Sequence, residues 1–339
     1  MNSPVPHDRP RVLVLHGDDL PPGHERMDDD PRLGGVVYAT ADELPARLPG
    51  AHVLLVWDLF TEALASAWSK ADSLDWVHAA TAGVDNLMFP ELVDSDVTVT
   101  NSRGVFDEPI AEYVLGQVIA FAKDFQRTWD HQREHRWEHR ETERVAGKRA
   151  LVVGTGPIGR QIARKLTAVG MRVSASGSRA REGDPDFGTV VESSLAERGS
   201  DGGPTLVSVL PEADYVVIAA PLTDATRGLV DRRFLGSMKH TARLINVARG
   251  PIVVQDDLVR ALDGGSIAGA ALDVFENEPL KAISPLWGLP GSVVSPHMAG
   301  DVVGWRDDLM DLFLDNLARR LDGRELLNVV DKSRGYVPG

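Results

Sequence analysis

The 339-residue sequence contains no cysteine. Disulfide bonds, thiolate metal sites and cysteine nucleophiles are therefore excluded, and the cytoplasm is the expected compartment. No run of apolar residues approaches the roughly 18 that a membrane span requires. The first ten residues also lack the apolar core of a signal peptide. We therefore expect a soluble cytoplasmic protein.

Basic residues are outnumbered in this chain. It has 36 Lys and Arg against 50 Asp and Glu, which gives a formal net charge of -14 and a sequence pI near 5.1. A negative field of this kind repels phosphate backbones and anionic lipids. Nucleic acid and membrane surfaces are therefore not expected partners, although a local arginine can still bind an anionic substrate.

Apolar residues are plentiful enough for two hydrophobic cores, since 43% of the 339 residues are hydrophobic. Short apolar runs alternate with helical patterns, which predicts α/β domains with doubly wound parallel sheets. The expected strands are 11–15, 53–56, 76–79, 97–100, 149–153, 172–175, 215–219, 243–247, 269–272 and 293–295. Helices are expected at 43–48, 61–68 and 309–321, and a surface loop at 21–31.

A long helix is expected near the middle of the chain. Asp107 is a candidate N-cap, Pro109 fits the first turn, and the apolar run 110–125 continues the helix toward residue 129. Three histidines then follow at a spacing that could place them on one helical face: His131, His135 and His139. Their neighbours are mostly arginine and glutamate, so a solvated, charged surface is favoured over a metal site. No metal ligand is assigned.

The strongest local motif, G-T-G-P-I-G, follows the expected strand 149–153 and leads into an amphipathic helix. The first glycine would permit a tight turn, the second would let the backbone approach a pyrophosphate, and the third would let the helix pack on the strand. The free N–H groups at the helix N-terminus would bind phosphate oxygens. This strand–turn–helix context predicts a dinucleotide site at Gly154, Thr155, Gly156, Pro157, Ile158 and Gly159.

The end of the next strand bears on which dinucleotide binds. An NAD site usually has an acidic residue there to hold the ribose 2′-hydroxyl. This chain instead reads Gly177-Ser178-Arg179, without a carboxylate. Ser178 and Arg179, helped by Arg181, could bind a 2′-phosphate, so NADP(H) is favoured over NAD(H). The alternative is a basic surface loop that merely lacks the acid.

Three polar residues follow later strands. They are Arg249 in INVARG, Glu278 in ALDVFENEPL and His297 in VVSPHMAG. In doubly wound sheets, residues just past the strand ends face the ligand crevice. We therefore expect these three side chains to converge beside the nicotinamide.

Several motifs in one order make the sequence resemble the D-2-hydroxyacid dehydrogenase family. They are TAGVDN, NSRG, the glycine loop, APLT, NVARG, DVFENEP and SPHMAG. The resemblance implies a homodimer and a Rossmann cofactor domain, residues 104–298, inserted into a flavodoxin-like substrate domain, residues 1–103 and 299–339. It implies Arg249, Glu278 and His297 as the catalytic trio, and the choice of Glu278 over Glu276 depends on this family pattern.

The resemblance also implies further binding residues. Asp273 is expected near the nicotinamide amide, and the backbone N–H groups around Gly83 and Val84 would form a second cradle for the substrate carboxylate. His297 would lie at both the cofactor and the substrate. The other expected cofactor contacts are Ala220, Pro221, Thr226, Val247, Ala248 and Gly300.

The three residue types suit reduction of a 2-oxo acid to a 2-hydroxy acid. Arg249 can hold the carboxylate and polarise the carbonyl with planar charged donors. His297 can supply the proton for the developing alkoxide, the usual role of imidazole in acid–base catalysis. Glu278 can orient the ring and favour its protonated form. The resemblance implies substrates such as glyoxylate and hydroxypyruvate, which NADP-dependent relatives often reduce, and a bulkier 2-oxo acid stays open.

Other functions fit the sequence less well. A formate dehydrogenase has glutamine where this chain has Glu278, and an L-lactate-type enzyme has its dinucleotide loop near the N-terminus. A dinucleotide-sensing scaffold without turnover is the alternative from another class. The presence of the whole trio favours an enzyme.

Overall fold

The computed structural model describes residues 9–58 and 61–338, so the first eight residues, part of the segment without signal-peptide character, lie outside the described residues. The chain divides into two compact units. The first is Met1–Phe106 with Val302–Gly339, and the second is Asp107–Asp301. The sequence predicted domain boundaries after residues 103 and 298, and the structure has them slightly later, after Phe106 and Asp301.

The first unit is built on a five-stranded parallel sheet in the order β2-β1-β3-β4-β5, the flavodoxin-like order. The central strands are fully buried and, apart from His78 on β4, apolar, as is usual for parallel strands covered on both faces. The strands are β1 Val12–Leu15, β2 Val36–Ala39, β3 Val53–Val56, β4 Trp76–Ala79 and β5 Thr98–Asn101. The α-helices are α1 Glu25–Asp28, α2 Leu44–Arg47, α3 Ala63–Ala67, α4 Pro90–Val93 and α11 Trp305–Leu321.

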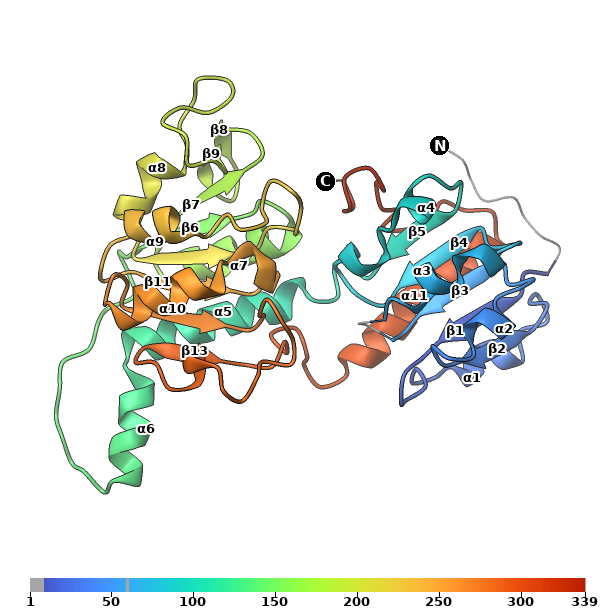
Figure 1. Ribbon diagram of the computed structural model, residues 1–339, viewed down its shortest axis with the longest axis horizontal. Helices are drawn as coiled ribbons and strands as arrows, with labels where there is room; N and C mark the ends of the chain where they lie inside the picture. The colour runs from blue at the N-terminus through green and yellow to red at the C-terminus, as the bar shows by residue number, and fades with distance from the viewer. Residues whose placement is uncertain (1–8, 59–60, 339) are drawn as a thin grey trace. The chain divides into compact units, whose positions relative to one another are not determined.

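The C-terminal helix α11 belongs to this first unit, a point that its amphipathic pattern left open. Figure 1 shows α11 lying along the sheet behind β3 and β4. Phe313 of α11 stacks on Trp76 of β4 with 5.5 Å between ring centroids, and Leu309 and Leu317 are buried on the same helix. The chain therefore leaves the first unit at Phe106 and returns at Val302 to complete its core.

The second unit is built on an eight-stranded sheet in the order β13-β12-β11-β10-β6-β7-β9-β8, and β8 is its one antiparallel strand. The order reverses between β6 and β10, which is where doubly wound sheets bind ligands. The strands are β6 Arg149–Val153, β7 Arg172–Gly177, β8 Arg181–Asp184, β9 Gly188–Glu192, β10 Tyr215–Ile218, β11 Arg243–Asn246, β12 Gly269–Leu272 and β13 Ser292–Val294. The α-helices are α5 Asp107–Ala122, α6 Phe125–Arg133, α7 Pro157–Ala168, α8 Leu206–Val209, α9 Arg232–Ser237 and α10 Gln255–Asp263.

Three strands were not predicted from the sequence, and all lie at or beside sheet edges. β2 has a half-buried pattern, and β8 is almost entirely polar with the sequence REGD. Edge strands have one unpaired side and need fewer apolar residues, so periodicity detects them poorly. The expected loop at 21–31 also contains the short helix α1.

The predicted central helix is two helices. Asp107 is the first residue of α5 rather than its N-cap, and α5 ends at Ala122. Asp124 has φ 51°, a left-handed conformation that interrupts the helix before α6 begins. Because α6 ends at Arg133, His131, His135 and His139 do not share a helical face: His131 is buried and the other two are exposed. Among residues 9–58 and 61–338, no group of three or more His, Asp or Glu side chains is arranged to hold a metal ion.

One buried histidine makes the stability of the first unit depend on pH. His78 on β4 is completely buried, shares a hydrogen bond of 2.8 Å with Thr100 Oγ1 and lies 5.4 Å from the Phe313 ring. Burial lowers the pKa of His78 from 6.5 to about 3. Between these two values the unfolded chain binds a proton that the folded chain does not bind, so the free energy of unfolding falls as the pH falls.

We expect this loss to approach about 1.4 kcal/mol per pH unit well below pH 6.5. Urea unfolding between pH 7 and pH 4.5, followed by tryptophan fluorescence, measures it. His78→Gln removes the titrating group, so its stability should fall less steeply with decreasing pH than that of the wild type. Parallel curves for the two proteins would contradict the prediction.

Candidate active site

The predicted cofactor residues of the second unit gather at one edge of its sheet. The glycine loop follows β6, Ser178 and Arg179 follow β7, and Ala220 and Pro221 follow β10. The remaining positions follow the next three strands: Val247, Ala248 and Arg249 after β11, Asp273 after β12, and His297 and Gly300 after β13. All these strands are parallel, so their carboxyl ends lie at the same edge. A dinucleotide and the reacting groups can therefore be held along a single edge.

The glycine loop has the geometry that a bound pyrophosphate needs. Gly154 has φ 118°, and a Cβ there would lie 2.5 Å from the Ala219 carbonyl oxygen. A Cβ on Gly159 would lie 2.1 Å from the Gly154 carbonyl oxygen, so α7 packs directly on the loop. Among the described residues other than the two that flank Gly156 in the chain, no atom would lie within 4 Å of a Cβ on Gly156. No side chain of these residues caps the N-terminus of α7. The backbone N–H groups at the start of α7 are therefore suited to bind a phosphate group.

The two arginines that follow β7 differ in whether a carboxylate of the same unit already binds them. Ser178 and Arg179 are exposed, and no residue of the described ranges forms an ion pair with Arg179. Arg181, by contrast, donates from Nη2 to Asp184 at 2.8 Å. Arg179 is thus free to meet a phosphate group, whereas Arg181 would have to leave a carboxylate.

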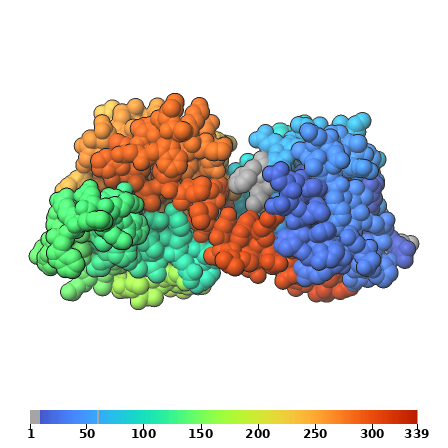
Figure 2. Space-filling view, turned by 90° about the horizontal axis from the view of Figure 1, so that it is seen from below, coloured from blue at the N-terminus to red at the C-terminus, as the bar shows by residue number. Residues whose placement is uncertain are grey.

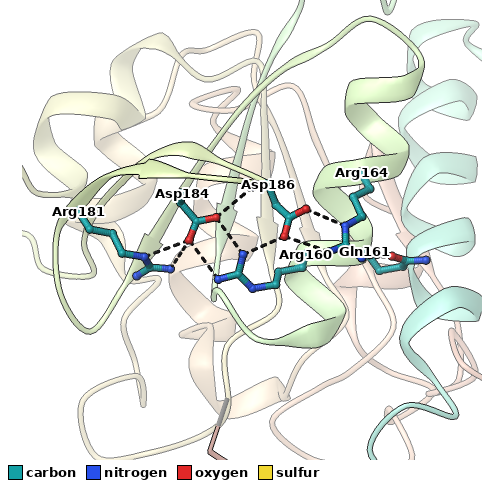
Figure 3. Close-up of polar contacts among 6 residues, drawn as sticks. All are labelled: Arg160, Gln161, Arg164, Arg181, Asp184 and Asp186. Carbon is teal, nitrogen blue, oxygen red and sulfur yellow. Dashed lines mark hydrogen bonds and ion pairs between the residues drawn. The ribbon is translucent and has the colours of Figure 1, made fainter.

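Asp184 belongs to an ion-pair network that fastens the β8–β9 hairpin to α7. Its carboxylate accepts from Arg160 of α7 at 2.9 Å, and Asp186 accepts from Arg160 and from Arg164 (Figure 3). The Arg160 and Arg181 guanidinium groups hold the pKa of Asp184 well below its usual range, and burial opposes them. The network holds the hairpin in place. Because the hairpin begins where residues 178–180 end, the network also fixes the C-terminal end of the loop that carries Arg179.

The His297 and Glu278 side chains form a hydrogen-bonded pair. His297 Nδ1 lies 2.7 Å from Glu278 Oε2, and the other carboxylate oxygen accepts from the Phe275 N–H at 2.9 Å. Burial raises the pKa of Glu278, but the hydrogen bonds from His297 and Phe275 outweigh it and leave that pKa below its ordinary value. Glu278 is thus fixed by its own loop and orients the ring, with Nε2 on the opposite side from the pair.

Arg249 is positioned by a tight turn after β11. Asn246 is completely buried; its side chain donates to the Arg249 carbonyl at 3.2 Å and accepts from the Ala248 N–H at 3.1 Å. A Cβ on Gly250 would lie 1.8 Å from the Phe275 carbonyl carbon, so this turn lies against the loop that leads to Glu278. The charge of Arg249 accordingly helps lower the pKa of Glu278.

The other predicted residues are placed by local hydrogen bonds. Thr226 Oγ1 donates to the Pro221 carbonyl at 2.6 Å and closes the loop after β10. Asp273 is 2% exposed and accepts from the Ala299 N–H at 2.8 Å. Gly83 and Val84 lie in the first unit after β4, where Thr81 Oγ1 donates to the Gly83 carbonyl. Their part in binding substrate stays a prediction.

Sequence reasoning missed the supporting residues of the site. Asn246 is a polar residue at the end of an apolar strand, and this was a signal that could have found it. The network of Asp184 and Asp186 with α7 had no such signal, because it joins charged residues across a hairpin that was not predicted.

Comparison with known proteins decides the family. Residues 115–299, more than half of the chain, match the family model described as D-isomer specific 2-hydroxyacid dehydrogenase, NAD binding domain. The chain belongs to this dehydrogenase family. The predicted family and the predicted pair of parallel-sheet α/β domains are thereby confirmed. The dehydrogenase is an NAD(P)-dependent oxidoreductase that acts on the CH–OH group of donors.

Named relatives of the dehydrogenase include reductases of small 2-oxo acids. It is 29% identical over 265 residues to a glyoxylate/hydroxypyruvate reductase of Arabidopsis thaliana, covering 77% of this chain and 80% of the relative. It is 32% identical over 274 residues to a glyoxylate reductase of Korarchaeum cryptofilum, covering 79% of each. The solved structure of an NADPH-dependent glyoxylate/hydroxypyruvate reductase of Sinorhizobium meliloti, in complex with NADP and sulfate, superposes with TM-score 0.80 at 26% identity, covering 97% of this chain and 100% of the other.

In the described part of the dehydrogenase, no helix is both long and apolar enough to cross a lipid bilayer.

Proposed function

We propose that this enzyme reduces a small 2-oxo acid of the glyoxylate or hydroxypyruvate type to the 2-hydroxy acid with NADP(H), His297 acting as the acid/base. The observation that carries the proposal is the pairing of His297 with Glu278 at 2.7 Å on a loop that packs against the Arg249 turn, at the sheet edge that also carries the glycine loop. The names of similar proteins support the substrate class.

Each residue of the trio has one task in this reaction. Arg249 binds the substrate carboxylate through its guanidinium and polarises the neighbouring carbonyl. The dinucleotide, when bound, supplies the hydride that C2 accepts. His297 gives a proton from Nε2 to the developing alkoxide, so that one hydride and one proton convert the C=O group to CH–OH. Glu278 keeps the ring oriented through Nδ1, and solvent returns the proton to His297.

The preference for NADP(H) is supported by Arg179. The loop after β7 offers an exposed guanidinium and no carboxylate at 177–179, and such a group can bind a 2′-phosphate with charge-assisted hydrogen bonds. We also propose that the first unit, which carries Gly83 and Val84, contributes to binding the substrate. The second unit would then carry the dinucleotide.

The test follows oxidation of NADPH and NADH side by side with 2-oxo acids from glyoxylate to phenylpyruvate. Arg179→Ala should raise the KM for NADPH roughly 10- to 100-fold, the value of one or two charge-assisted hydrogen bonds, and leave that for NADH within about twofold. Arg181→Ala is the matched control, with a smaller expected effect because Asp184 already holds that side chain.

The outcomes separate the parts of the proposal. A preference for NADH would contradict the phosphate-binding role of Arg179, but it would not affect the proposed roles of Arg249, Glu278 and His297. Binding of both cofactors without turnover of any acid would favour a sensing scaffold instead.

We further propose that the enzyme is a homodimer. Residues 125–146, here called the α6 arm, extend from the body of the second unit (Figure 1) and lie at its surface as the green segment of Figure 2. Trp129 is 52% exposed and Trp137 fully exposed on this arm, and exposed aromatic residues are typical of interfaces. A monomeric molar mass by light scattering at assay concentrations would contradict this.

A further inference from the structure

A chain of partly buried hydrogen bonds leads from helix α5 through the buried Asp273 to the loop that carries His297. Tyr113 of α5 lies with its hydroxyl 2.5 Å from Ser295 Oγ, and Ser295 Oγ donates to Asp273 Oδ1 at 2.6 Å. The serine hydroxyl has a single proton, which it gives to the carboxylate, so Tyr113 must be the donor to Ser295. Burial raises the pKa of Tyr113, which keeps its phenol protonated as a donor.

The oxygen atoms of Asp273 also accept hydrogen bonds from the backbone around His297. Its Oδ1 accepts from the Met298 N–H at 3.0 Å and its Oδ2 from the Ala299 N–H at 2.8 Å. Its main-chain carbonyl accepts from the His297 N–H at 2.8 Å. One buried residue thus binds three successive N–H groups of the loop.

The backbone of His297 needs such support. It has φ 54°, a left-handed conformation that residues with a side chain adopt reluctantly. The surrounding hydrogen bonds must hold this conformation, because it decides where the imidazole points and hence whether Nδ1 meets Glu278. Asp273 cannot hold the loop firmly unless its own carboxylate is held, and Ser295 and Tyr113 are the side chains that do so.

We propose that Tyr113 and Ser295 are positioning residues for the reaction: through the Asp273 carboxylate they fix the backbone at His297 and so the direction of the imidazole. Neither acts on the substrate directly. This inference rests on the proposed function for its effect on turnover, whereas the holding of the loop can be measured without turnover.

The experiment compares Tyr113→Phe and Ser295→Ala with two controls. Tyr215→Phe likewise removes one tyrosine hydroxyl from the second unit, but from a fully buried tyrosine that donates to the Val118 carbonyl instead. Ser295→Thr keeps the hydroxyl at the same position and should rescue. For each protein we would measure kcat, the KM for the 2-oxo acid, and hydrogen exchange of the amides of residues 297–299.

The expected result is a selective loss in kcat. Tyr113→Phe and Ser295→Ala should lower kcat roughly 5- to 20-fold, because each removes one hydrogen bond from the chain, and leave the KM within about twofold. Exchange at residues 297–299 should quicken in both. The double variant should be no worse than the worse single one, since both break the same chain. Tyr215→Phe and Ser295→Thr should match the wild type.

The proposal is overturned by unchanged exchange in both variants, by unchanged kcat despite faster exchange, or by additive losses in the double variant. A wild type that turns over no 2-oxo acid would instead overturn the proposed function. The exchange measurement would still decide whether Tyr113 and Ser295 hold the His297 loop.

Discussion

His297→Asn is expected to lower kcat about 1000-fold while the affinity for the dinucleotide stays within a few-fold of the wild type. Acid–base catalysis by a positioned side chain is worth roughly 100- to 10,000-fold, and an amide cannot carry a proton in this way. Asparagine is the sharpest replacement because it tolerates the left-handed backbone at this position. Steady-state kinetics and a cofactor titration by fluorescence together measure the effect.

His240→Asn is the matched control. His240 is an exposed histidine of the same unit, so its replacement removes an imidazole without touching the candidate site. If His297→Asn retained kcat within tenfold of the wild type, the proton would have to come from another group, and the pairing with Glu278 would be structural only.

Replacing Arg249 by lysine is the second change with a large expected effect. We expect kcat/KM for the 2-oxo acid to fall roughly 100- to 1000-fold. Lysine keeps the positive charge but loses the planar pair of donors that a carboxylate binds. Loss of two charge-assisted hydrogen bonds costs about 3 to 4 kcal/mol, and each 1.4 kcal/mol is a factor of ten in rate.

A panel of substrates makes this prediction specific. The loss should be shared by all 2-oxo acids, because each presents the same carboxylate, and the KM for the dinucleotide should change little. Arg233→Lys, at an exposed arginine of the second unit, controls for the substitution itself. An effect on cofactor affinity alone would assign Arg249 to the dinucleotide instead of the substrate.

Much of the fold could be predicted because the central parallel strands are written in continuous apolar runs. VLVL of β1 and YVVI of β10 are buried on both faces, and their residues leave little choice of structure. β2 and β8 could not be found in this way, because an edge strand is half-solvated and its sequence is correspondingly mixed. The break between α5 and α6 results from the left-handed backbone of Asp124. It could not be predicted, because no proline or glycine marks it in the sequence.

The candidate site likewise has residues that could be predicted and supporting contacts that could not. Glu278 and His297 could be placed together because both follow adjacent parallel strands, and the structure brings them within 2.7 Å. The residues that support them were predictable only in part. Asp273 was expected near the cofactor, and Asn246 stands out as a polar residue at the end of an apolar strand, but neither signal indicates which backbone groups these side chains bind. Asn246 holds the Arg249 turn and Asp273 holds the His297 loop through hydrogen bonds to backbone groups, which leave no periodic pattern in the sequence.

The fastening of the β8–β9 hairpin to α7 has a consequence for how this enzyme can diverge. β7 ends at Gly177 and β8 begins at Arg181, so the residues that discriminate between cofactors would sit on a short connection with both ends anchored. Residues 178–180 belong neither to the glycine loop nor to the loops that carry Arg249, Glu278 and His297. If the proposed role of Arg179 holds, selection or engineering could change the cofactor preference at these few residues without altering the Arg249, Glu278 and His297 loops.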